Sequence, residues 1–197
     1  MRTTTIAAAA CLLLLTMTAA SAANYSVFLN GQNESPSNNS PGVGAAIVSF
    51  DASSHILQVN VAFGSLMGDS SAAHIHCCTP TAGTGTGGVA TETPTFGGFP
   101  LGVHAGGYSN TYDTTLLASW NSAFVTANGG TAAGAEAAFA AGLNSGKAYL
   151  NIHSSLYPAG EIRGFLTPIA AVPEPSSIAM LGLGLPAVLL MARRRRA

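Results

Sequence analysis

Charged side chains are scarce in this sequence, where Asp, Glu, Lys and Arg make up only 8% of 197 residues. Most of the basic residues lie at the two ends of the chain, which leaves residues 23–172 with Lys147 and Arg163 against seven acidic residues. Such a segment lacks the basic surface that a nucleic-acid backbone requires, so nucleic-acid binding is excluded. Disorder is excluded as well, because 48% of the chain is hydrophobic.

Common catalytic motifs are also missing. No serine lies in a G-x-S-x-G turn, and no glycine-rich run ends in the Gly-Lys-Ser/Thr of a phosphate-binding loop. We therefore expect a protein that is not an enzyme and that needs no cofactor.

Cysteine is rare, and only Cys77 and Cys78 lie outside the N-terminal apolar run. Adjacent Cα atoms across a trans peptide are ~3.8 Å apart, below the usual disulfide range of ~4.4–6.8 Å. In an oxidising compartment three states are open. They are a vicinal disulfide in a distorted turn, which we favour, an intermolecular disulfide, or Cys78 acting as a soft metal ligand beside His74 and His76.

The N-terminus is typical of a secretory signal peptide. Arg2 precedes an unbroken apolar run at residues 6–15, and small residues follow at 16–23. This pattern predicts a signal peptide over residues 1–22, cut by signal peptidase after Ala22. A lipoprotein with Cys11 as the lipidated residue is the alternative.

The C-terminus carries three features in a fixed order. Pro173, Glu174 and Pro175 interrupt the chain, residues 178–192 are apolar, and four arginines follow at Arg193, Arg194, Arg195 and Arg196. As a helix the apolar segment would be ~22 Å long, slightly short of a ~30 Å hydrocarbon core. The arginines would hold the C-terminus in the cytoplasm. We therefore predict a transmembrane helix over residues 178–192.

This tail, residues 169–197, resembles the PEP-CTERM sorting signal of Gram-negative bacteria. The resemblance implies that the precursor is anchored in the inner membrane until an exosortase recognises the Pro-Glu-Pro box and removes the tail. The mature protein would then reach the cell surface or the extracellular matrix.

Residues 23–168 are predicted to form one β domain. Residues 55–63 alternate, with Leu57, Val59, Val61 and Phe63 on one face, and residues 43–50 are the expected partner strand across a turn at 51–54. Further strands are expected at 25–29, 72–77, 114–120, 147–153 and 161–166. One short helix is expected at 132–143, and residues 79–110 are expected to form a large surface excursion. The fold class is mainly β, either an antiparallel β-sandwich or a flattened Greek-key barrel.

Four sequence blocks in this region resemble the CHRD domain. They are FLNGQNESP at 28–36, AHIH at 73–76, GKAYLNIH at 146–153 and PAGEIRG at 158–164. The resemblance spans about residues 25–166 and implies an extracellular β-rich module whose bacterial members have no settled activity.

Strand alternation places several polar residues of these blocks on shared faces. On the strand at 72–78, Ala73, Ile75 and Cys77 face one way, while His74, His76 and Cys78 face the other. By the same rule Asn151 and His153 share a polar face, as do Glu161 and Arg163. If the apolar sides all face the core, we expect these polar side chains to converge.

Two interpretations of this polar group are open. It can be a hydrogen-bonded network that fixes strand register. It can also be a metal site, since a His-x-His pair on a strand is a common arrangement for Zn or Cu ligands. Copper–zinc superoxide dismutases, which are also flattened barrels, use such a pair.

The sequence therefore predicts a non-enzymatic component of the cell surface or exopolysaccharide matrix, with exopolysaccharide as a candidate partner. The alternative is a periplasmic or surface protein that binds Cu or Zn and resembles superoxide dismutase in function.

Overall fold

The computed structural model describes residues 22–170. The predicted sorting tail beyond residue 170, and all of the predicted signal peptide except Ala22, lie outside the described residues. The predicted transmembrane helix at 178–192 lies outside them too. Within residues 22–170 no helix has the length and apolar character needed to cross a membrane.

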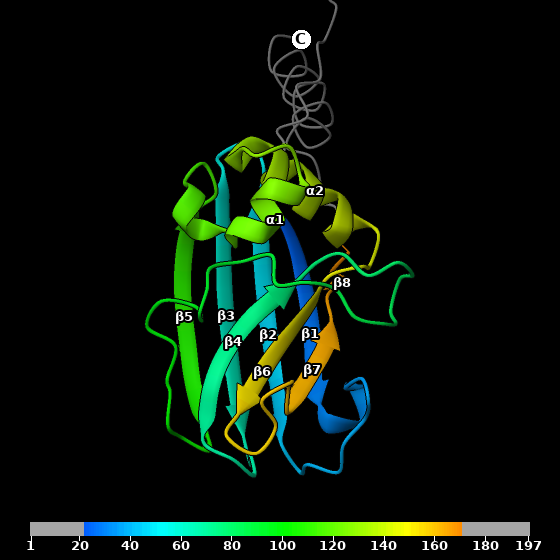
Figure 1. Cartoon of the computed structure of the whole chain (residues 1–197), viewed down its shortest axis with the longest axis vertical. Helices are drawn as coiled ribbons and strands as arrows, with labels where there is room; N and C mark the ends of the chain where they lie inside the picture. Colours follow the sequence, from blue (N-terminus) through cyan, green and yellow to red (C-terminus); the bar gives the residue numbers. More distant parts are fainter. Residues whose placement is uncertain (1–21, 171–197) are drawn as a thin grey trace, which may run out of the picture.

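Eight strands form one antiparallel sheet in the order β4-β6-β7-β1-β2-β3-β5, with β8 pairing on β1 (Figure 1). The strands are β1 Ala23–Asn30, β2 Val43–Asp51, β3 Ile56–Gly64, β4 Ser70–His76, β5 Gly106–Asp113, β6 Tyr149–Ser154, β7 Ile162–Phe165 and β8 Thr167–Pro168. The helical elements are η1 Gly31–Asn33, η2 Leu117–Ser119, α1 Ser122–Ala127 and α2 Ala132–Asn144.

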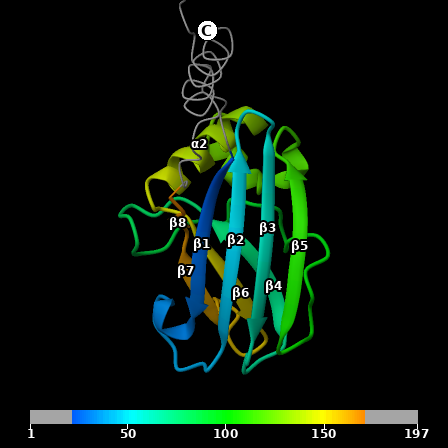
Figure 2. The same cartoon turned by 180° about the vertical axis from the view of Figure 1, so that it is seen from behind.

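The sheet curls into a half-barrel, so that β4 and β6 lie in front of β2 and β3 in one view and behind them in the other (Figures 1 and 2). The prediction of a mainly β, antiparallel fold is confirmed. In place of the predicted β-sandwich or flattened Greek-key barrel the structure has a half-barrel, because one continuous sheet supplies both walls and β4 and β5 do not pair in the described residues. The two α-helices cover one end of the half-barrel.

Alternation along the long strands builds the core. Leu57, Val59, Val61 and Phe63 of β3 are all buried, as predicted, and β2 pairs with β3 from Val43↔Gly64 to Asp51↔Ile56. The turn between the two strands is closed by the Asp51 carboxylate, which accepts the backbone N–H of Ser53 at 2.8 Å. The predicted hairpin is therefore confirmed, and the residues that alternate inward in the sequence are the residues that pack in the core.

The predicted helix at 132–143 corresponds to α2, which buries Ala135, Phe139 and Leu143. The Phe139 ring packs edge-on against Phe50 of β2, at a centroid distance of 5.8 Å, and against Trp120 at 5.4 Å. The preceding helix α1 was not predicted. Its six residues are too few to produce a helical period that can be recognised.

The strand predicted at 114–120 is wrong, because the chain turns there and the strand lies earlier, as β5. The Asp113 carboxylate accepts the N–H of Thr115 at 2.9 Å, and the Trp120 indole donates to the Thr114 carbonyl at 2.9 Å. These local bonds end the strand at Asp113 and lead into η2. The signal for β5 was the alternation of Tyr108 and Tyr112, both buried, inside a glycine-rich stretch that disfavours strands.

The segment between β4 and β5, residues 77–105 (the β4–β5 connection), is only in part the surface excursion that the sequence predicts at 79–110, because residues 80–86 are exposed but later residues pack on the sheet. It runs along the free edge of β4, where Ala90 N donates to Ile75 O at 2.9 Å and Phe96 N donates to Ala73 O at 3.1 Å. Threonine hydroxyls complete the edge, since Thr91 Oγ1 accepts Ile75 N at 3.0 Å. Phe96 is also fully buried. This connection therefore covers the edge and contributes to the core.

Candidate functional site

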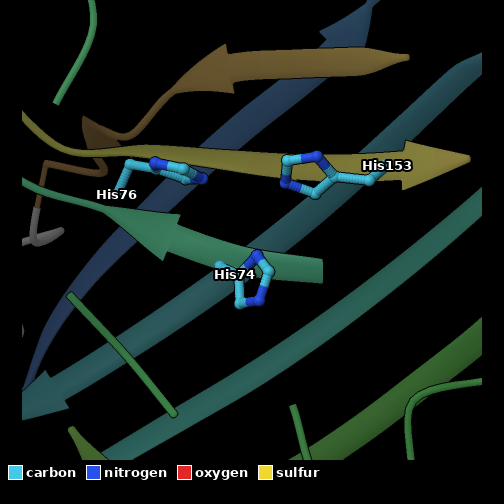
Figure 3. A group of neighbouring side chains, drawn as sticks. All are labelled: His74, His76 and His153. Atoms are coloured by element: carbon cyan, nitrogen blue, oxygen red, sulfur yellow. The ribbon is translucent and has the colours of Figure 1, made fainter. Parts of the chain in front are cut away.

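Two neighbouring strands bring three histidines together. In the β4–β6 pair, Ala72 lies opposite His153 and His74 opposite Asn151, so His74, His76 and His153 project from the same face of the sheet. One ring nitrogen from each lies within 4.8 Å of the others. Figure 3 shows the three rings turned toward one another around a common space. We call these three residues the histidine cluster.

A backbone carbonyl fixes the orientation of each imidazole. His74 Nε2 lies 2.6 Å from Pro94 O, His76 Nδ1 lies 2.9 Å from Gly87 O, and His153 Nδ1 lies 3.0 Å from Pro158 O. A carbonyl oxygen can only accept, so in each case the histidine nitrogen is the donor and the tautomer is defined. Two of these carbonyls come from the β4–β5 connection. The connection that covers the edge of β4 thus also holds two of the rings.

The other nitrogen of each ring has no partner. His74 Nδ1, His76 Nε2 and His153 Nε2 are buried and make no hydrogen bond among the described residues. Since their opposite nitrogens carry the protons, these three atoms present lone pairs. The cluster is therefore a set of three imidazole acceptors that face the same space.

Burial keeps the cluster uncharged. His74 and His76 are 6% and 9% exposed, so the polar face that the sequence predicts is covered by protein. Desolvation lowers the pKa of all three histidines, and the pKa of His76 falls to about 4. The charges that protonated His153 and His74 would carry, and the nearby Arg163, lower the pKa of His76 further. The histidines are neutral at neutral pH, which is the state that binds metal.

A second buried polar group lies beside the cluster on β6, β7 and the η1 loop. Asn151 Nδ2 and Arg163 Nε lie 3.5 Å and 3.8 Å from Glu34 Oε2. Burial raises the pKa of Glu34 to about 7, although Arg163 and the hydrogen bonds from Ser35 and Asn151 act to lower it. The structure thus places Asn151 and Arg163 next to the histidines but joins them to Glu34. Sequence analysis did not select Glu34, and its only signal was its place in the first CHRD-like block.

Glu161 does not join the histidine cluster. The buried carboxylate of Glu161 accepts hydrogen bonds from Ser40 Oγ at 2.6 Å and from the backbone N–H groups of Met67 and Gly68. It therefore completes the hydrogen bonding of the β3–β4 turn. Burial acts to raise the pKa of Glu161, but the hydrogen bonds outweigh it and hold the pKa below its ordinary value.

Cys77 and Cys78 form a disulfide, so the Cys78 sulfur is not a free thiolate that could act as a metal ligand. The 3.8 Å Cα spacing expected for a trans peptide does not apply, because the Cys77–Cys78 peptide is cis and the Cα atoms lie 2.9 Å apart. The other two histidines lie apart from the cluster, with His55 paired to Glu136 and His104 beside Asp69.

Chemically, the cluster offers three neutral nitrogen ligands and no carboxylate. Imidazole suits Zn and Cu, and three histidines with one open position form one known type of catalytic zinc site. Ligating histidines usually donate their second N–H to a carbonyl or carboxylate, as all three do here. The three residues thus offer a set of nitrogen atoms that could hold a transition-metal ion.

A curled antiparallel sheet with three imidazoles on one face of β4 and β6 defines a β-rich domain with a candidate metal site. Comparison with protein families identifies the domain: residues 25–166 match the CHRD domain, and the chain belongs to that family. Residues 171–196 match the PEP-CTERM protein-sorting motif, which includes the predicted Pro173, Glu174, Pro175 and the four arginines. Both resemblances are confirmed. No significant match is found among curated proteins or among solved structures.

The sorting motif implies processing by exosortase and is typical of exported cell-surface proteins of Gram-negative bacteria. A CHRD domain joined to this motif fits a surface protein that is sorted by that enzyme.

Proposed function

We propose that this surface protein binds a zinc or copper ion through His74, His76 and His153. The observation that carries the proposal is the set of three unpartnered ring nitrogens that face one space, each on a ring whose other nitrogen is held by a carbonyl. This is the pattern by which proteins orient imidazoles toward a metal.

The alternative of a purely structural network fits this geometry less well. A network would pair the polar atoms, and each buried acceptor left without a partner costs about 1–3 kcal/mol. Three such unpartnered acceptor atoms lie here within 4.8 Å of one another. A bound ion would satisfy all three nitrogens at once. The cost of the bare cluster is therefore itself an argument for a ligand.

The spacing of the nitrogens suits an ion after a small adjustment. Zn–N bonds of ~2.0–2.1 Å in tetrahedral geometry separate the ligand nitrogens by about 3.4 Å. The cluster nitrogens lie within 4.8 Å of one another, so modest rotations of the rings bring them to that distance. The three imidazoles suit either metal, since neutral imidazole nitrogens bind both zinc and copper.

Export supports the same proposal. We place the mature protein at the surface after cleavage by signal peptidase and exosortase, where the Cys77–Cys78 disulfide would persist. A non-enzymatic role in the exopolysaccharide matrix is compatible with a metal-binding domain and stays part of the proposal. Superoxide dismutation by the copper-loaded protein is the activity that would make it an enzyme instead.

Calorimetric titration of the exported protein with Zn²⁺, with Cu²⁺ and with Cu⁺ under reducing, anaerobic conditions tests the metal site. We expect one ion per chain, and at least a hundredfold weaker binding in His76→Ala and His153→Ala. His104→Ala is the matched control, because His104 is a well-exposed histidine that is hydrogen-bonded to Leu66 O, outside the cluster. A wild-type protein that binds none of these ions would overturn the proposal.

A further inference from the structure

A second site lies on β7, between the η1 loop and the loop at 83–85. It is a cavity of about 440 Å³ with a mostly polar lining, and its walls include Arg163, Glu34, Phe165 and Thr84. This volume falls within the range of small-molecule sites. In Figure 1 the η1 segment and the turn of the β4–β5 connection lie at the two ends of β7 on the same side of the molecule. The ligand nitrogens of the histidine cluster are not part of this lining.

Arg163 supplies hydrogen-bond donors to this cavity. Its side chain is 5% exposed, and among the described residues its one hydrogen bond is donated by Nε to Asn33 O. The guanidinium lies over the Tyr149 ring, with Cζ 4.8 Å from the centroid. The ring fixes the plane of the guanidinium, and the terminal Nη groups remain as donors. A buried arginine with free donors at the wall of a cavity is suited to bind a ligand.

Glu34 supplies an acceptor beside those donors. Glu34 lines the cavity, its side chain is also 5% exposed, and Oε2 faces Arg163 Nε at 3.8 Å. The other oxygen, Oε1, is enclosed by protein on the side of Gly160. The cavity wall thus holds the Glu34 carboxyl next to the Arg163 donors. Ser35 and Thr84 add hydroxyl groups that can donate or accept a hydrogen bond, and Phe165 adds an aromatic ring.

We propose that this cavity binds one residue of a neutral polysaccharide. Each hydroxyl of a sugar both donates and accepts, so neighbouring hydroxyls match a guanidinium and a carboxyl placed side by side. The apolar face of the sugar ring can pack on Phe165. An anion is disfavoured, because the Glu34 carboxyl lies beside Arg163 and residues 23–172 hold seven acidic residues against two basic ones. This inference gives the proposed matrix role its ligand and rests on that role, and it does not depend on the metal site.

Titration of the exported protein with glucose, galactose, mannose, N-acetylglucosamine and cellobiose, followed by NMR, tests the site. We expect saturable shifts for at least one neutral sugar, with signals from the cavity residues moving most. Thr84→Trp fills the cavity from an exposed position and should weaken binding at least tenfold. Thr86→Trp is the matched control, since Thr86 is exposed on the same loop but does not line the cavity, and it should bind as the wild type does.

Three outcomes would overturn the inference. They are no response to any neutral sugar, unchanged binding in Thr84→Trp, or tenfold tighter binding of glucuronate or phosphate, which would indicate an anion site. Co-sedimentation with purified exopolysaccharide distinguishes a failure of the cavity as the sugar site from a failure of the matrix role. If Thr84→Trp still co-sediments, the matrix role stands and the cavity is not its site. If the wild type does not co-sediment, the matrix role fails.

Discussion

The imidazole of His76 lies flat against the ring of Tyr149, with a centroid distance of 4.7 Å and an angle of 8° between the planes. Tyr149 belongs to β6, between β4 and β7, and its ring also lies under the Arg163 guanidinium. One aromatic side chain therefore packs on a residue of the histidine cluster and on a residue of the polar cavity. Both candidate sites share this support, so a change at Tyr149 would disturb both.

The pH dependence of metal affinity follows from the lowered histidine pKa values. An imidazole must lose its proton to coordinate, so affinity falls only when the pH drops through the pKa of the folded protein. For His76 this is about 4, below the ordinary value of 6.5. We expect zinc or copper affinity to change little between pH 7.5 and 6 and to fall steeply at lower pH. Calorimetric titrations across this range check it, and a fall centred on pH 6.5 would contradict it.

The stability of the metal-free protein should depend on pH through two opposing groups. Between pH 6.5 and 4 the unfolded chain protonates His76 while the folded protein does not, so acidification costs up to about 3 kcal/mol from this residue. Glu34 acts in the opposite sense. Its pKa is raised to about 7 in the folded protein, whereas the unfolded chain takes up this proton only when the pH falls to about 4.5. Stability from Glu34 is therefore lost as the pH rises toward 7.

Glu34→Gln removes the opposing contribution and keeps the shape of the side chain. With a chelator present, the urea midpoint of this variant should fall more steeply than that of the wild type between pH 7 and 4.5. His74 and His153 add to the loss on acidification, since burial lowers their pKa values as well. Parallel pH profiles for the two proteins would show that Glu34 does not carry the proton assigned to it.

Core packing predicts the stability cost of truncating buried side chains on the two strands that carry the histidine cluster. Ile75 and Ile152 are fully buried on the face opposite the histidines, so Ile75→Ala and Ile152→Ala should each destabilise the protein by ~2–5 kcal/mol. Ile47→Ala serves as the control, because Ile47 is 43% exposed and should change the free energy of unfolding by less than about 0.5 kcal/mol. Urea denaturation measures all three, and equal midpoints would reject the assigned faces.

Gly160 should not tolerate a side chain. It has φ +136°, and a Cβ there would lie 2.6 Å from Asn151 Nδ2 and 2.7 Å from Glu34 Oε1. Gly160→Ala should therefore cost more than about 1 kcal/mol and disturb the Glu34–Asn151 contact. Gly107→Ala is the comparison, since no atom lies within 4 Å of the added carbon at that exposed strand position. The prediction fails if both variants unfold at the same urea concentration.

Sorting can be tested by mass. We expect the exported protein from a host with exosortase to end near Pro173–Pro175 and to lack the residues after about Ser176. The same gene in a host without the enzyme supplies the control and should yield protein that keeps its tail. Intact-mass spectrometry distinguishes the two forms. A full-length tail on mature protein from the first host would contradict the expected processing.

Sequence patterns predicted the parts of the fold that rest on regular alternation. The β2–β3 hairpin followed from the inward positions Leu57, Val59, Val61 and Phe63, and the shared face of His74 and His76 followed from strand geometry. The curl of one sheet into two walls could not be predicted, because alternation does not define strand order. The role of the β4–β5 connection was also missed, since its bonds to β4 come from backbone groups and threonine hydroxyls without any period.

The candidate site was predictable in part for similar reasons. Parity placed Glu161 on the histidine face, but its carboxylate turns toward the N–H groups of Met67 and Gly68, which need an acceptor. Glu34 was missed because it comes from the η1 loop, and only the tertiary fold brings it beside Asn151 and Arg163. The carbonyls that orient the rings carry no side-chain signature at all.

The backbone along the outer side of β4 is already occupied by residues 88–102. An exposed strand edge is the usual point at which another chain adds as a further strand. An open β4 would allow copies to stack edge to edge into fibrils. Because Ala90 and Phe96 take the places that an incoming strand would need, neighbouring copies cannot add a strand at the β4 edge.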